Sequence, residues 1–145
     1  MTHLPEHSHE KFLIATNTAL KVNNPEGFID AVFALLGNAA ASQSLGKTMK
    51  DPACLQQAIA DQAFSNAKAA NDLAGQTAAL VFRTLERNSG TVGGKSDPCT
   101  SIQAVNPEIA ALEQHQVHHS HFPCLDGYVF LLFCPRIPHR QVQLL

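Results

Sequence analysis

Charged and aromatic side chains are scarce in this sequence. Asp, Glu, Lys and Arg make up 15% of the 145 residues, the net charge is −2, and the chain has one tyrosine and no tryptophan. Without a basic stripe there is nothing to follow a phosphate backbone, so we expect no nucleic-acid partner. The shortage of aromatic rings also argues against stacking platforms for bases or sugars.

Long hydrophobic runs are also missing. The longest apolar stretch near the C-terminus is the seven-residue "YVFLLFC" (128–134), whereas a membrane-spanning helix needs about 20 residues. The first residues, "MTHLPEHSHEK", do not resemble a signal peptide. Further along, "FIDAVFALLGNAAAS" (28–42) ends in small residues as a signal segment does, but Asp30 inside it favours an amphipathic helix.

Catalytic signatures are absent as well. The sequence has no G-x-S-x-G, no C-x-x-C and no pair of carboxylates on one predicted helical face, so we expect a protein that is not an enzyme. The stretch "SGTVGGKS" (89–96) approaches the phosphate-binding pattern G-x-x-x-x-G-K-[ST]. A helix is predicted before it, and Asp97-Pro98 blocks the helix required after it, which favours a loop between helices.

What the sequence does contain is helical periodicity in its middle part. Asp51-Pro52 is an N-cap followed by proline at the first helical position, and Asn71-Asp72 caps a second helix. The residues expected inward on the first helix recur at helical spacing: Leu55, Ile59, Ala63, Phe64 and Ala67. Those of the second helix are Ala74, Ala78, Val81 and Leu85.

Two "NPE" triplets predict further helix starts, at Asn24 and at Asn106. Arg83 and Arg87 fall near the end of the second helix, where cations suit the helix dipole. We therefore predict an all-α fold, a small helical bundle over residues 24–116. A flexible segment (1–23) precedes it, and an irregular or disordered tail rich in His, Phe, Pro and Cys (117–145) follows.

Four cysteines occur, at positions 54, 99, 124 and 134. A bridge between Cys54 and Cys99 closes the two-helix segment into a loop, which the chain-entropy model values at roughly 4 kcal/mol. We favour this bridge in an oxidising compartment, and two buried free thiols are the alternative. Cys124 and Cys134 are a second potential pair.

The densest cluster of potential metal ligands is "HQVHHSHFPC" (115–124). If the last helix continues, His115 and His119 share one face, and three more ligands follow within reach of zinc: His118, His121 and Cys124. No H-E-x-x-H pattern occurs, and Pro123 breaks a helix here. We therefore expect no cofactor, with zinc bound by this cluster as the alternative.

Three stretches carry a resemblance to a protein group: "DPACLQQAIADQAF", "AALVFRTLERNSGTVG" and "CTSIQAVNPEIAALEQHQ". Over residues 51–116 the chain resembles small, Ala-rich, secreted proteins of filamentous fungi that have no established activity. The resemblance implies secretion and a disulfide between Cys54 and Cys99, and it supplies no catalytic residue. It ends at Gln116, where the tail begins.

These observations predict a small, secreted, non-enzymatic protein of a fungal cell surface or culture medium. Association with the cell wall or with itself is the expected kind of contact. The alternatives are a metal-binding protein that uses the cluster at 115–124 and an intracellular, cytoplasmic helical adaptor with reduced thiols.

Overall fold

The computed structural model describes residues 9–90 and 94–114, which are helical and contain no strand. Its elements are α1 (Glu10–Val22), α2 (Val32–Leu35), α3 (Asn38–Ala41), the 3-10 turn η2 (Pro52–Cys54), α4 (Leu55–Ala69), α5 (Leu73–Thr84) and α6 (Pro107–Ala110). The predicted helical bundle is confirmed for these residues. The tail predicted at 117–145 lies outside them.

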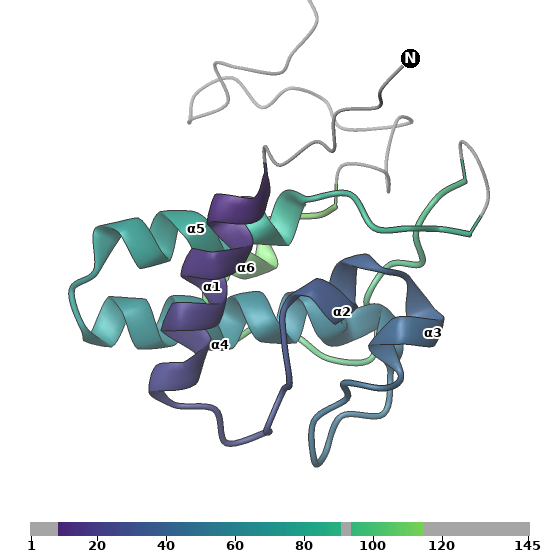
Figure 1. The fold of residues 1–145 in the computed structure, drawn as a ribbon, viewed down its shortest axis with the longest axis horizontal. Helices are drawn as coiled ribbons and strands as arrows, with labels where there is room; N and C mark the ends of the chain where they lie inside the picture. The colour runs from purple at the N-terminus through teal and green to yellow at the C-terminus, as the bar shows by residue number, and fades with distance from the viewer. Residues whose placement is uncertain (1–8, 91–93, 115–145) are drawn as a thin grey trace, which may run out of the picture.

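Helices α4 and α5 form an antiparallel pair at the centre of the fold (Figure 1). The predicted capping chemistry is present: the Asp51 carboxylate accepts a hydrogen bond from the Ala53 N–H at 2.9 Å and caps η2, which leads into α4, and the Asp72 carboxylate accepts one from the Gly75 N–H at 3.0 Å and caps α5. Asn71 takes a positive φ of 53° in the turn between the helices, a conformation that asparagine tolerates well. Short-range chemistry alone explains this hairpin.

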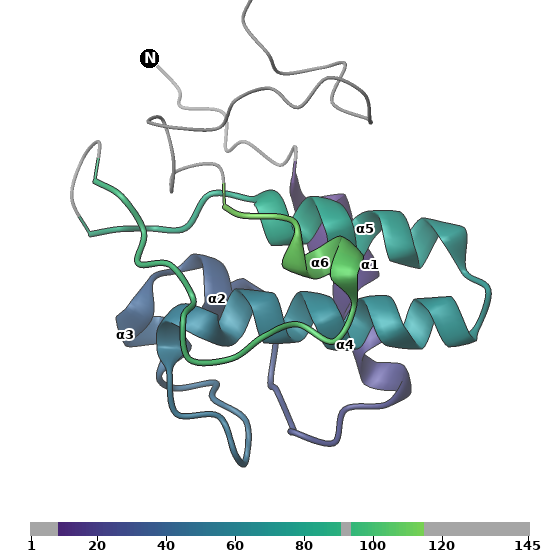
Figure 2. The same cartoon turned by 180° about the vertical axis from the view of Figure 1, so that it is seen from behind.

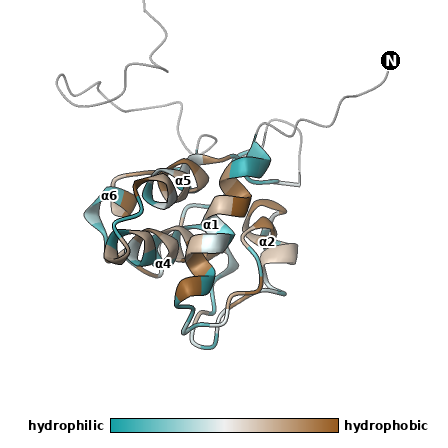
Figure 3. Ribbon diagram, turned by 60° about the vertical axis from the view of Figure 1, so that its left-hand side comes forward, coloured by the Kyte–Doolittle hydropathy of each residue, from teal (hydrophilic) through white to brown (hydrophobic). Residues whose placement is uncertain are grey.

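The prediction that residues 1–23 are flexible is wrong for the part of them that the structure describes. Residues 10–22 form α1, which crosses α4 and α5 on one side of the pair (Figure 1) and buries Ala19 and Leu20 against them. Hydrophobic turns alternate with pale or hydrophilic ones along α1 in Figure 3. Asn66 on α4 then holds the end of α1, because its amide donates to the carbonyls of Ala19 and Asn23, both at 2.8 Å.

The helix predicted to start at Asn24 is also wrong. The Asn24 side chain accepts hydrogen bonds from the N–H groups of Gly27 and Phe28, both at 3.0 Å, and so closes a turn. Helix α2 begins eight residues later and is one turn long. Asparagine supplies the same kind of hydrogen bond to a turn and to a helix N-terminus, so the start signal was ambiguous.

The stretch before α6 runs along α4 on the side opposite α1 (Figures 1 and 2). Helix α6 itself is a single turn that buries Ile109 against α4 and α5. The third helix was therefore correctly placed but is shorter than the pattern suggested. The core lies between α1, α4 and α5 and is built largely from alanine with a few large side chains, led by Leu20, Leu55, Ile59 and Phe82.

Candidate functional site

The disulfide joins Cys54, at the end of η2, to Cys99, 45 positions later, with their Cα atoms 4.5 Å apart. Cys54 is fully buried. The bridge therefore fixes the start of α4 to the otherwise irregular stretch that leads to α6. Part of that stretch, residues 101–104, forms one wall of the groove described in the next paragraph.

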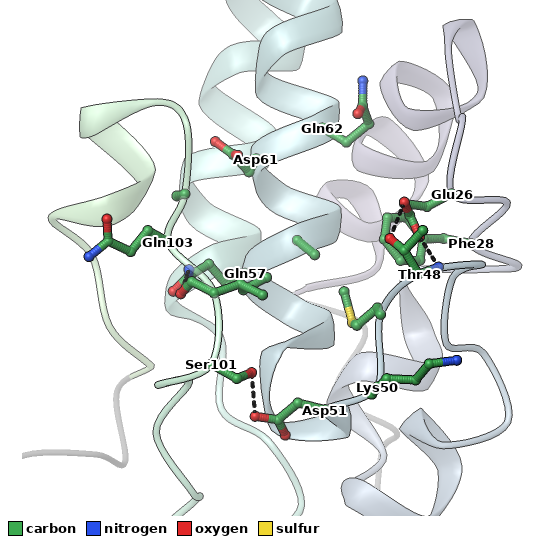
Figure 4. Close-up of a pocket in the computed structure, with 14 residues that line it drawn as sticks. Glu26, Phe28, Thr48, Lys50, Asp51, Gln57, Asp61, Gln62, Ser101 and Gln103 are labelled. Carbon is green, nitrogen blue, oxygen red and sulfur yellow. Dashed lines mark hydrogen bonds between the residues drawn. The ribbon is translucent and has the colours of Figure 1, made fainter.

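A groove of about 430 Å³ lies beside this bridge. Helix α4 forms its base, residues 101–104 form one wall, and the turn at 26–28 together with residues 48–51 forms the other (Figure 4). Five of the side chains that line the groove are apolar: Phe28, Met49, Ala58, Ile102 and Ala104. Segments more than 70 positions apart in the sequence thus share one apolar hollow.

Two carboxylates on the rim are held by neighbouring donors. Glu26 accepts hydrogen bonds from the Thr48 N–H at 2.8 Å and the Thr48 hydroxyl at 2.7 Å. These hydrogen bonds lower the pKa of Glu26 below its ordinary value, so it is ionised at neutral pH. Asp51, besides capping η2, accepts a hydrogen bond from the Ser101 hydroxyl at 2.7 Å across one end of the groove (Figure 4).

A third carboxylate, Asp61, comes from α4. It accepts hydrogen bonds from the N–H groups of Val105 at 2.7 Å and Asn106 at 2.9 Å, and from the Asn106 amide at 2.7 Å. Asp61 therefore anchors the start of α6 to α4. The Asn106 side chain is used in this contact and with Ser65, and it does not cap its own helix.

Two arginines at and beyond the end of α5 are buried, which the helix-dipole interpretation did not foresee. Arg87 is 2% exposed, and its guanidinium donates to the Ala34 carbonyl at 2.9 Å and to the Asn38 side chain at 2.6 Å. Arg83 is 4% exposed and donates to the Gln57 side chain at 3.1 Å. Burial lowers the pKa of both arginines.

The stretch that approaches a phosphate-binding pattern borders a second hollow of about 380 Å³, lined in part by Arg87, Lys95 and Ser96. Within the described residues, no helix follows Ser96 until Pro107. The helix N-terminus that a phosphate loop needs is therefore missing here, as Asp97-Pro98 predicted.

The predicted zinc cluster, His115, His118, His119, His121 and Cys124, lies outside the described residues, as does Cys134. Within residues 9–90 and 94–114, no three His, Cys, Asp or Glu side chains are grouped so as to hold a metal ion. Each helix in those ranges is also too short or too polar to cross a bilayer.

No family model matches this sequence, and neither the curated proteins nor the solved structures contain a match. Sequence reasoning found the bridge from cysteine spacing and helix caps. The groove was not predicted, because no sequence pattern in residues 26–28, 48–51 and 101–104 indicates that these three segments lie next to one another.

Proposed function

We propose that this chain is a small secreted protein that acts by binding, without catalysing a reaction, at a fungal cell surface or in the surrounding medium. The Cys54–Cys99 disulfide carries the proposal. Disulfides persist in oxidising compartments and are rare in the reducing cytosol. Secretion at a fungal surface is also what we expected from the sequence of residues 51–116, and it remains part of this proposal.

The three carboxylates of the groove already accept hydrogen bonds from the protein itself, which favours a binding role over a catalytic one. Asp51, Asp61 and Glu26 each accept hydrogen bonds that hold a cap, a helix start or a turn. A general acid or base has to reach a substrate with its carboxylate oxygens, and these oxygens are already engaged by donors of the protein itself. The groove offers an apolar surface with fixed charges around it, as small-molecule sites do.

The test is the state of the thiols in protein made by its native producer. We expect the protein in the culture medium, with one peptide pair linked through Cys54 and Cys99 in a non-reducing digest. Reduction is expected to separate this pair with a gain of two hydrogens. A Cys99→Ser variant is the matched control and should give no linked pair.

The contrary outcome is equally definite. Protein recovered from the cytosol with Cys54 and Cys99 both free would contradict secretion and would favour the intracellular adaptor. Zinc titration tests the other alternative separately: submicromolar binding that is lost in His119→Ala would support the cluster at 115–124, and weaker binding unchanged by that substitution would discard it.

A further inference from the structure

We propose that the groove between α4 and residues 101–104 binds a small organic cation with an apolar body, of the alkylammonium or arylammonium class. The assignment rests on the proposal that the protein acts by binding, and on the oxidised Cys54–Cys99 bridge that fixes one wall of the groove. It is drawn from the size of the groove, its apolar base and the charge around it.

The size of the groove sets the class of ligand. A volume of about 430 Å³ lies in the lower part of the range of roughly 300 to 1,000 Å³ that is typical of small-molecule sites. Phe28, Met49 and Ile102 supply apolar atoms to the lining; Ile102 is 37% exposed, whereas Phe28 and Met49 belong to the core and present only small parts of their side chains. Methionine suits such a site because its flexible thioether adapts to ligands of different shape.

The charge around the groove sets the sign of the ligand. Glu26 and Asp61 approach it from opposite sides, and Asp51 closes one end (Figure 4). Among the described lining residues, Lys50 is the one cation, and its ammonium extends away from Asp51 and Asp61 in Figure 4. The lining residues thus carry three carboxylates and one ammonium, while two further cations act from outside the lining, Lys47 on Glu26 and Arg87 on Asp51.

None of the three carboxylates forms an ion pair with a lysine or arginine in the part of the chain that the structure describes. Their hydrogen-bond partners are neutral donors such as the Thr48 and Ser101 hydroxyl groups, and Lys47 and Arg87 act on Glu26 and Asp51 at longer range. An ionised carboxylate has about four acceptor positions on its two oxygens, so each retains capacity for a ligand ammonium. An anionic ligand would meet the same charges as repulsion.

The disulfide gives the groove a fixed wall. Residues 101–104 follow Cys99 directly, and Cys54 anchors that cysteine to the start of α4. Without the bridge, Ser101 and the Gln57 amide, which donates to the Ile102 carbonyl at 3.2 Å, remain to hold this wall. Reduction is therefore expected to weaken ligand binding before it unfolds the helices.

The experiment titrates the oxidised full-length chain with n-octylammonium, 1-octanol and octanoate, which share one chain and differ in head-group charge. Affinity is measured by calorimetry, and contacts are mapped by amide chemical shifts. We expect saturable one-to-one binding of octylammonium, at least tenfold tighter than octanoate and several-fold tighter than octanol. The largest shifts are expected at Ala58 and Ile102.

Two charge variants and one control sharpen the test. Lys50→Glu is expected to tighten octylammonium binding several-fold, and Glu26→Gln to weaken it several-fold, because the glutamine retains an acceptor for Thr48 but loses the charge. Glu108→Gln changes the net charge equally on α6, outside the groove, and is expected to have little effect. If Glu26→Gln fails to fold, the Lys50→Glu variant and the comparison of the three ligands still test whether the groove prefers a cation.

Several results would overturn the assignment. Octanoate binding as tightly as octylammonium would do so, as would equal affinities in the Lys50→Glu and wild-type proteins. A concentration-dependent dimer with shifts at Ala58 and Ile102 would assign the groove to a second copy. Failure of ligand binding in protein secreted with its disulfide intact would remove this assignment and leave the proposal of secretion standing.

Discussion

Replacing Arg87 by methionine should destabilise this fold strongly, whereas the same change at Arg83 should be close to neutral. Both arginines are buried and lie four positions apart. They differ in their hydrogen bonds: Arg87 has several partners, whereas the Nε and one Nη of Arg83 have no partner among the described residues. Methionine retains most of the apolar stem at each position and removes the charged head.

The magnitude for Arg87 follows from its contacts. It donates at 2.9 Å to the Ala34 carbonyl and at 2.6 Å to the Asn38 side chain, with longer bonds of 3.3 Å to the carbonyls of Pro52 and Ala53. A hydrogen bond to a charged group contributes about 1.5–3 kcal/mol. Two short bonds therefore give roughly 3–6 kcal/mol, from which relief of the buried charge subtracts about 1–2 kcal/mol, so we expect a net loss of about 2–4 kcal/mol.

For Arg83 the two contributions nearly cancel. It has one hydrogen bond, to Gln57 at 3.1 Å, and burial disfavours its charged form. Replacing a buried, poorly partnered charge by an apolar side chain of similar volume is often neutral or stabilising. We expect Arg83→Met to change the free energy of unfolding by less than about 1 kcal/mol, or to raise it.

Urea unfolding followed by helical circular dichroism measures both changes. Arg87→Met should lower the midpoint with an unchanged slope, since the same surface is exposed on unfolding. Arg87→Lys keeps the charge but lacks the planar set of donors, and it should fall between wild type and Arg87→Met. The exposed Lys21→Met serves as the control for loss of one charge. The reasoning is refuted if Arg87→Met and Arg83→Met cost the same.

Three further predictions follow from contacts described above. The double variant Cys54→Ser/Cys99→Ser should lose about 4 kcal/mol of unfolding free energy relative to the oxidised protein, measured in urea; a loss under 1 kcal/mol would contradict the loop-entropy argument. Gly46→Ala should lower the thermal midpoint and shift groove amide resonances, because a Cβ there would lie 2.5–2.7 Å from Glu26 atoms. Since Thr48 lowers the folded pKa of Glu26, its stabilising contribution is present above its ordinary pKa and disappears as pH falls through the folded value. Stability measured from pH 7 to pH 3 should therefore fall less in Glu26→Gln, and identical pH profiles would contradict this.

The central hairpin was predictable because its determinants are local. Asp51 and Asp72 lie within three residues of the N–H groups that they cap, and the apolar spacing of α4 repeats over four turns. The sequence placed Cys54 in the first turn of a helix and Cys99 just before the third helix, so that a bridge between them was favoured over two free thiols. The two caps need the chain to be known over one helical turn only, whereas the bridge joins residues 45 positions apart.

Polar residues on the buried faces were harder to interpret. Gln56 is fully buried because its amide donates to the carbonyls of Phe82 and Leu85 at 2.7 and 3.0 Å, where α5 ends. Gln114 in turn donates to Gln56 at 2.8 Å. A glutamine on a helix is usually solvent-facing, so its partners, between 26 and 58 positions away, decide whether it can be buried.

The sequence by itself determined the helical class and the α4–α5 hairpin, since capping and helical periodicity act between neighbours along the chain; it favoured the Cys54–Cys99 pair but left two free thiols as the alternative. The tertiary structure decided that α1 belongs to the core, that Asn24 closes a turn, and that Arg83 and Arg87 are buried. It also created the groove, which takes its base from α4 and its walls from three loops. Those outcomes depend on hydrogen-bond partners and apolar contacts from distant segments, which meet only after the chain has packed.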